Sequence, residues 1–91
     1  MPAELRHYRD DSNLEVDLVV EREDGAWGAF EVKLGADRED VGARSVLALD
    51  RKMTERGERP ASVLAVVVGV GGVARVRPDG VRVVPVDLLV A

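Results

Sequence analysis

The sequence predicts an α/β fold: a small mixed sheet with an N-terminal hairpin, one crossover helix and a C-terminal hairpin. Three observations support this fold class. Residues 14–22 and 26–34 alternate between apolar and other side chains around an acidic, glycine-containing turn, as an antiparallel hairpin does. Residues 42–53 carry apolar side chains at helical spacing. Residues 63–69 form an unbroken apolar run, which indicates a central strand buried on both faces and parallel to the second hairpin strand.

The register of the first hairpin decides which of its charged side chains meet. A two-residue loop would put Glu31 on the face opposite Asp17. A three-residue loop, residues 23–25, makes the two apolar faces coincide, and it pairs Asp17 with Glu31 and Glu15 with Lys33. We therefore predict the three-residue loop.

This register brings together groups that are suited to chemistry. Carboxylates directly opposite each other have Cβ atoms about 4.5–5.5 Å apart, and they repel unless a cation or a proton lies between them. A hard divalent cation such as Mg²⁺ suits the Asp17–Glu31 pair, since it takes one or two carboxylates and keeps waters for a phosphate substrate. Lys33 would then place an ammonium beside the reacting phosphate. Lysine is scarce in this chain, which has only Lys33 and Lys52.

The segment before the hairpin is predicted to contain a strand at residues 4–10 and a turn at residues 11–13. His7 lies in that strand. It could act as a general base or contact a phosphate, but packing on the strand or at the surface is the simpler interpretation. Trp27 falls on the same face as Glu31, where it could stack on a base, although a role in shielding the sheet is favoured.

The predicted helix follows the hairpin. Asp37 is expected to cap its N-terminus, with Asp40 completing a partial capping box. Gly57 and Pro60 mark its end. The stripe that should pack on the sheet comprises Gly42, Val46, Leu49 and Met53, widened by Leu47.

The C-terminal third is predicted to form a hairpin. Residues 69–72 match a dinucleotide-binding glycine pattern only weakly, and no helix follows them, so we interpret them as a loop. Residues 73–77 and 81–84 flank an Asp-Gly turn and form the second hairpin, which Pro85 ends. The apolar tail, residues 86–91, is expected to pack on the sheet.

Composition narrows the classes of protein that fit. A chain of 91 residues is one domain, 1–91, with a modest core. The absence of cysteine excludes disulfides and cysteine-type zinc sites, and it favours the cytoplasm. The longest apolar run falls short of the roughly 20 residues that a membrane span needs, so no membrane association is expected.

The net charge of −4 does not favour nucleic acid, whose protein partners usually carry a basic footprint. Part of this acidity belongs to the predicted site itself. A local basic patch remains an alternative to a solvated surface. Its candidate members are Arg6, His7, Arg9, Arg38, Arg44, Arg51 and Lys52.

The pattern of Asp17, thirteen residues and then Glu31-Val32-Lys33 resembles the signature of the PD-(D/E)XK nuclease superfamily, whose members have the restriction-endonuclease-like fold. The resemblance implies that Asp17 and Glu31 bind Mg²⁺ or Mn²⁺, with the Val32 carbonyl as a further ligand. It implies that Lys33 orients the attacking water or stabilises the transition state. The proline that precedes the aspartate in the family is replaced here by Val16.

A narrower resemblance covers nearly all 91 residues. The segments HYRDDSNLEVDLVVE, EVKLG and DGVRVVPV look like the C-terminal domain of unknown function found on many prokaryotic AAA-type ATPases. By this resemblance the chain has a restriction-endonuclease-like core that lacks its leading helix. The chain is then either a C-terminal fragment of a larger ATPase or a truncated form of the fold.

Three functions are compatible with the sequence. The first is a metal-dependent nuclease in which Asp17, Glu31 and Lys33 are catalytic and Glu15 is accessory, as a further ligand-supporting group or as the partner of Lys33. The second is a non-catalytic module that docks to an ATPase domain or to a second copy of itself, with Glu15–Lys33 as an exposed ion pair worth only ~0.2–1 kcal/mol. The third is a solvated sheet face. DNA or RNA as substrate, and any base specificity, are not indicated.

Overall fold

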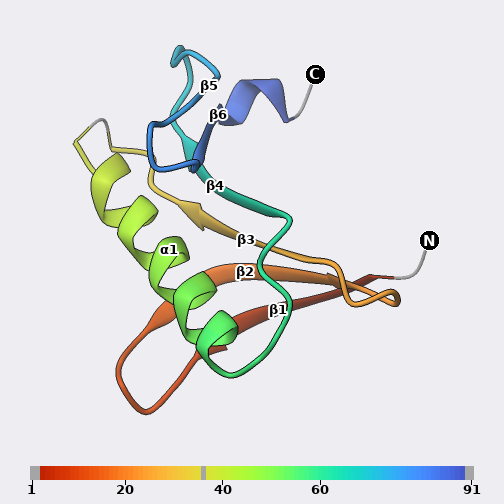
Figure 1. Cartoon of the computed structure of the whole chain (residues 1–91). Helices are drawn as coiled ribbons and strands as arrows, with labels where there is room; N and C mark the ends of the chain where they lie inside the picture. The colour runs from red at the N-terminus through yellow and green to blue at the C-terminus, as the bar shows by residue number, and fades with distance from the viewer. Residues whose placement is uncertain (1–2, 36, 90–91) are drawn as a thin grey trace.

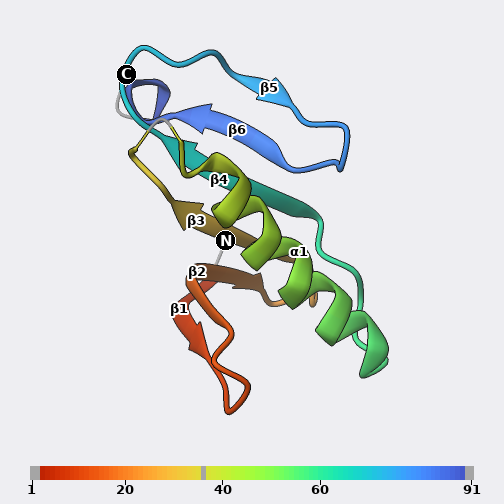
Figure 2. The same cartoon turned by 90° about the vertical axis from the view of Figure 1, so that its left-hand side faces the viewer.

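The computed structural model describes residues 3–35 and 37–89 and shows one sheet with one long helix lying on it (Figures 1 and 2). Its strands follow the order β1-β2-β3-β4-β6-β5. β3, β4 and β6 are parallel to one another, and the remaining neighbours are antiparallel. This confirms the predicted fold class. In chain order the elements are β1 (Ala3–Arg9), β2 (Glu15–Arg22), β3 (Trp27–Val32), α1 (Glu39–Glu55), β4 (Val63–Val68), β5 (Arg75–Val76), β6 (Arg82–Pro85) and a 3₁₀ turn, η1 (Val86–Leu88).

The hairpin between β2 and β3 has the predicted three-residue loop. Leu18 pairs with Phe30, and the Arg22 amide donates to the Ala26 carbonyl at 2.8 Å. Gly25 closes the loop with φ at +88°, in the left-handed region that favours glycine. The same register, continued along the strands, sets Asp17 against Glu31.

β2 departs from the predicted alternation at one point. Arg6 of β1 pairs with Val19, and Tyr8 pairs with Val16, so β2 has one residue more than β1 between these pairs. This is a β-bulge, and Asp17 lies within it. Val16 therefore packs in the same core cluster as Val19. Regular alternation along residues 14–22 would place Val16 and Val19 on opposite faces of the sheet, and the extra residue reverses the alternation between them.

Helix α1 covers one face of the sheet with the predicted stripe. Gly42, Val46 and Leu49 are buried against the strands, together with Ala43, and Met53 is partly buried. The helix lies to the left of the sheet in Figure 1 and in front of it in Figure 2. Among the described residues, no helix is both long and apolar enough to span a bilayer.

The C-terminus of α1 ends as predicted. Arg56 is the C-cap, and Gly57 follows with φ at +84°. The Gly57 amide donates to the Thr54 carbonyl, and the Glu58 amide donates to the Met53 carbonyl, both at 3.0 Å. These two bonds satisfy carbonyls of the last turn, so glycine is required by the backbone at this position.

The predicted N-terminal cap is wrong. The N-cap is Arg38, not Asp37, and no side chain caps the helix. Asp40 does not complete a capping box. It accepts a hydrogen bond from Arg77 at 2.8 Å, while Glu39 bonds to both Arg75 and Arg77. The acidic first turn of α1 is thus used to hold the C-terminal hairpin.

The C-terminal elements follow the predicted order but not all of the predicted bounds: β5 is Arg75–Val76, shorter than the predicted strand at residues 73–77, and the tail also differs. β4 is parallel to β3 and is buried on both faces at its middle, where Ala65, Val66 and Val67 are at most 7% exposed. Residues 69–74 form a loop, and β5 pairs with β6 as the second hairpin. The tail does not pack on the sheet within the described residues: Leu88 and Leu89 are more than half exposed, and residues 90–91 lie outside the described part.

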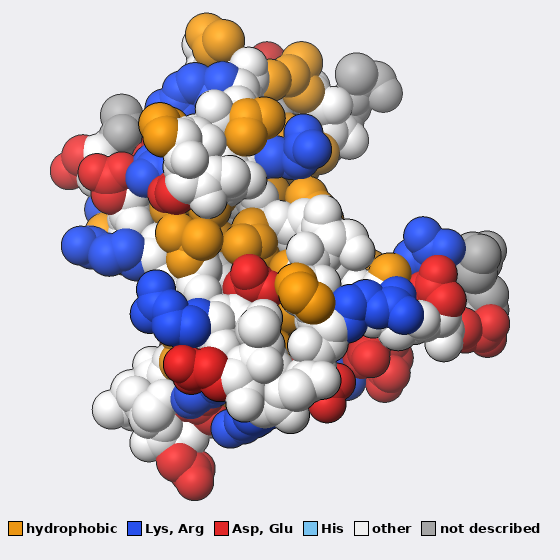
Figure 3. Space-filling view, in the orientation of Figure 1, with side chains coloured by type: hydrophobic (Ala, Val, Ile, Leu, Met, Phe, Trp, Pro, Cys, Tyr) orange, Lys and Arg blue, Asp and Glu red, His pale blue; other side chains and the backbone are white. Residues whose placement is uncertain are grey.

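The second face of the sheet stays open. Among the described elements, no helix lies on the side of the sheet opposite α1, which looks to the right in Figure 1, although Ala65 and Val67 of β4 are buried on this side. Figure 3 shows the molecule hollowed there, between the β2–β3 turn and the C-terminal elements. Strand pairing places a row of apolar side chains on this open face: Leu5, Leu18, Val20, Phe30, Val32, Val63, Ala65, Val67 and Val84.

Candidate functional site

The predicted site lies where β2 and β3 part. Their ladder ends at Leu18 and Phe30. Continuing the register would give the Val32 amide a backbone partner in β2, because hydrogen-bonded pairs alternate along an antiparallel ladder. Instead the Asp17 carboxylate accepts the Val32 amide at 2.8 Å, and the Glu31 carboxylate accepts the Asp17 amide at 3.3 Å. The Asp17 carboxylate therefore replaces a backbone partner at the opening of the hairpin, and the Glu31 carboxylate binds the amide of the residue opposite it.

Glu31 is the one charged side chain in the buried core of the described residues, with 3% of its surface exposed. Its burial, with the hydrogen bond and the negative charge of nearby Asp17 as further causes, raises the pKa of Glu31 to about 7. Lys33 opposes this shift but does not cancel it. Near neutral pH, Glu31 is thus poised between its acid and its carboxylate, and a cation beside it would favour the carboxylate.

Lys33 is positioned by one contact of its backbone and one contact of its side chain. Its amide donates to the Val67 carbonyl at 2.9 Å, which continues β3 against β4. Its Nζ lies 3.7 Å from Oε2 of Glu31, and the side chain is about a quarter exposed. The predicted triplet Asp17, Glu31 and Lys33 is therefore brought together in one place.

Gly42 of α1 makes room for this lysine. A Cβ atom at position 42 would lie 3.0 Å from Cγ of Lys33 and 3.1 Å from both Cγ atoms of Val66. Sequence reasoning treated Gly42 only as part of the apolar stripe. Its signal was available, because a glycine inside a helical pattern usually has a packing reason.

The site opens into a hollow of about 310 Å³. Asp17 lies exposed at its edge, while Glu31 forms part of its floor. Ser45 of α1 contributes to the wall and was not predicted from the sequence. The lining residues are Asn13, Leu14, Glu15, Asp17, Glu31, Lys33 and Ser45.

Glu15 has a different partner from the one predicted. Its Oε2 lies 3.0 Å from Nε2 of His7, in β1. The β2–β3 ladder ends before position 15, so the expected cross-strand ion pair with Lys33 does not form; within the described residues, the ion pair of Lys33 is with Glu31. His7 therefore approaches the edge of the site through Glu15.

The donor set fits a hard divalent cation. Mg²⁺ binds through one or two carboxylates and retains several waters, which Asp17 and the buried Glu31 would allow. In the part of the chain that the structure describes, no cluster of three or more His, Cys, Asp or Glu residues is arranged to hold a metal. Val32 ends β3 with its side chain on the open face, and the role of its carbonyl as a ligand stays a prediction.

Several members of the predicted basic patch have structural partners. Arg6 pairs with Glu21 at 2.9 Å. Lys52 bonds to Asp10, and to the Ser12 hydroxyl at 2.9 Å. These cations hold the fold together and are not free to form a basic surface.

Comparison with protein families gives one match. Residues 1–89 match a family described as a domain of unknown function, DUF4143. The chain therefore belongs to the DUF4143 family. Comparisons with curated proteins and with solved structures gave no match. Membership of DUF4143 assigns no reaction, so the function of this DUF4143 domain has to be argued from its site.

Proposed function

We propose that this domain is a divalent-metal-dependent phosphodiester hydrolase with its site at Asp17, Glu31 and Lys33. One observation supports this most strongly: two carboxylates, one of them buried, fill the gap between parting strands with a lysine ammonium 3.7 Å from the buried one. A purely solvated charge cluster would not bury Glu31 to 3% exposure, because a buried charge is costly unless it is paired.

The roles of the residues follow from their positions. Asp17 and Glu31 would hold Mg²⁺ or Mn²⁺, and Lys33 would stabilise the charge that develops on the phosphate. The bound ion would supply Lewis acidity and a water of lowered pKa. Glu15, hydrogen-bonded to His7, would add negative charge at the edge of the hollow. The resemblance of this pattern to PD-(D/E)XK nucleases agrees with the proposal and suggests a nucleic acid as substrate.

The decisive experiment is a calorimetric titration of Mn²⁺ into the wild type and into Asp17→Ala. We expect binding by the wild type and none by the variant. Nuclease assays with a Lys33→Ala control then separate metal binding from hydrolysis, since Lys33 is not a predicted ligand. Equal heats from the two proteins, or none from either at millimolar Mn²⁺, would contradict the assignment of the metal site.

A second candidate function is favoured by the open face of the sheet. Sheets with parallel strands usually have both faces covered, yet here α1 covers only one. Val32 is 46% exposed and Leu5 67% exposed on the open face. In this alternative the domain is a docking module for an AAA-type ATPase domain or for a second copy of itself. Either function suits a cysteine-free chain in the cytoplasm.

A further inference from the structure

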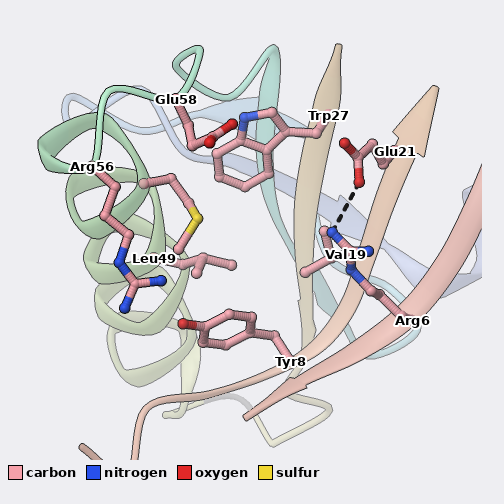
Figure 4. Close-up of a pocket in the computed structure, with 9 residues that line it drawn as sticks. Arg6, Tyr8, Val19, Glu21, Trp27, Leu49, Arg56 and Glu58 are labelled. Carbon is pink, nitrogen blue, oxygen red and sulfur yellow. Dashed lines mark hydrogen bonds and ion pairs between the residues drawn. The ribbon is translucent and has the colours of Figure 1, made fainter. Parts of the chain in front are cut away.

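A second cavity lies at the other end of α1, away from the carboxylate site. It has a volume of about 290 Å³ and is enclosed by the C-terminal half of the helix and strands β1 to β3 (Figure 4). Its lining combines two aromatic rings, three aliphatic or thioether side chains and four charged groups. These residues are Arg6, Tyr8, Val19, Glu21, Trp27, Leu49, Met53, Arg56 and Glu58.

The aromatic walls are fixed in place by their polar ends. The Trp27 indole N–H donates to the Arg59 carbonyl at 2.7 Å, and the Tyr8 hydroxyl donates to Asp10 at 2.8 Å. Figure 4 shows the two rings at opposite ends of the cavity with Leu49 and Val19 between them. Leu49 is 1% and Val19 is 4% exposed, so they form a dry floor. The cavity thus offers an apolar floor between two anchored aromatic rings, to which an apolar ring could bind.

The rim of the cavity carries a positive and a negative side chain, Arg56 and Glu58, on the turn that ends α1. Arg56 and Glu58 flank Gly57, whose amide and that of Glu58 are both bonded to the last turn of α1. On the other side Arg6 and Glu21 satisfy each other at 2.9 Å. None of the ion pairs found among the described residues involves Arg56 or Glu58, so both remain available to a ligand.

We propose that this cavity binds a free α-amino acid with an aromatic side chain. The ring would lie between Trp27 and Tyr8, the carboxylate would face the Arg56 guanidinium, and the ammonium would face the Glu58 carboxylate. The volume of about 290 Å³ is just below the usual range of about 300–1,000 Å³ for ligand sites, which suits a small ligand with one ring.

The charges at the rim argue against a nucleotide. A phosphate could bond to Arg56, but it would also meet the carboxylates of Glu58 and Glu21. A zwitterion, with one positive and one negative group, is complementary to both the Glu58 carboxylate and the Arg56 guanidinium. The proposal is independent of the carboxylate site, which lines a different hollow and shares no residue with this cavity.

The test uses the single tryptophan of the chain as the reporter. L-Phenylalanine, which does not obscure indole emission, is titrated into the full chain while Trp27 fluorescence and amide NMR shifts are followed. We expect a saturable change with NMR shifts gathered around Tyr8 and Leu49. The uncharged analogue N-acetyl-L-phenylalaninamide should bind about tenfold more weakly, because it lacks both charge-assisted contacts.

Variants at the rim assign the two contacts without disturbing the core. Arg56→Gln and Glu58→Gln should each weaken L-phenylalanine binding about tenfold. Arg51→Gln and Glu55→Gln change exposed charges in α1 outside the cavity and should leave binding unchanged. The proposal is overturned by an absence of saturable change up to about 10 mM ligand, by equal binding of the neutral analogue, or by tighter binding of deoxyadenosine monophosphate.

Discussion

Glu31 is the residue on which the site depends. It is buried, it accepts the Asp17 amide, and its neighbours are one carboxylate and one ammonium. Keeping it ionised costs free energy in the folded state, which the raised pKa of about 7 expresses. A protein that retained such a group only for stability would do better with an apolar side chain, because burying a charge is costly.

This cost makes a prediction about pH. The pKa of Glu31 rises from 4.5 to about 7 on folding, so the folded state binds more protons between these values, and stability falls as the pH rises through this window. Glu31→Gln has no carboxylate to ionise, so the variant should not lose stability as the pH rises through this window. At pH 8 the variant should be more stable than the wild type by about 3 kcal/mol, a difference that should be absent at pH 4. Urea unfolding at the two pH values measures it.

The control for this prediction is Glu55→Gln, which changes an exposed glutamate at the end of α1. It should leave the dependence of stability on pH as it is in the wild type. A Glu31→Gln difference of equal size at both pH values would show that hydrogen bonding, and not ionisation, governs this position.

Gly42 gives a second prediction at the residue scale. Replacing a helical glycine by alanine usually stabilises a protein by about 0.5–1 kcal/mol. Here the new Cβ would press on the fully buried Val66, which would have to shift within the core, and on Lys33. We expect Gly42→Ala to lower the free energy of unfolding by about 1 kcal/mol in urea denaturation. Arg44→Ala, at an exposed position of α1, is the control, and a stabilised Gly42→Ala protein would contradict the packing argument.

Among the elements, the turn between β1 and β2 is held to α1 by Lys52, which contacts Asp10 and Ser12. Lys52 bonds to Asp10, which also accepts hydrogen bonds from Ser12 and Tyr8. These contacts, Lys52 first, hold the pKa of Asp10 well below its usual 3.8. The contribution of Asp10 to stability is therefore present above about pH 3.8 and is lost as the pH falls below it.

We predict that Lys52→Met and Asp10→Asn each lower the urea midpoint at pH 7, and that the double variant lowers it by less than the sum of the two. The reason is that both substitutions remove the same contact. Asp11→Asn, next to Asp10 and exposed, should have no effect. Strictly additive losses from the two variants would show that the ion pair does not join the turn to the helix.

The hairpin register and the position of the site residues could be predicted from the sequence. The alternation of side chains is local, and a loop with an odd number of residues fixes which positions face each other. The bulge at Asp17 could not be predicted from the sequence, because it arises from the pairing of β2 with β1. The prediction of Asp37 as N-cap, with Asp40 in a capping box, was wrong for a similar reason. Glu39 and Asp40 bind arginines more than thirty positions away in the sequence. Such long-range partners leave no mark in a local pattern.

At the scale of the whole molecule, the two faces of the sheet differ in kind. One face carries α1, the core, the carboxylate site and the cavity between Trp27 and Tyr8. The other face presents aliphatic and aromatic side chains to solvent. The sheet has two edge strands: β1 bears Glu4, Arg6 and Arg9, and β5 has only the two residues Arg75–Val76. Charged side chains and a very short strand both disfavour pairing of edges between copies. Association of this domain should therefore use the open face.

The last prediction follows from that face. In sedimentation velocity the wild type should shift from monomer to dimer as its concentration rises, because two open faces would bury Val32 and Leu5 against each other. Val32→Lys, with its charge at the centre of the contact, should keep the protein monomeric without loss of stability. Val70→Lys, an equally apolar and 79% exposed position beside the hollow that also includes Glu39, is the matched control and should still dimerise. A wild type that stays monomeric at every concentration would rule out a second copy as the occupant of this face.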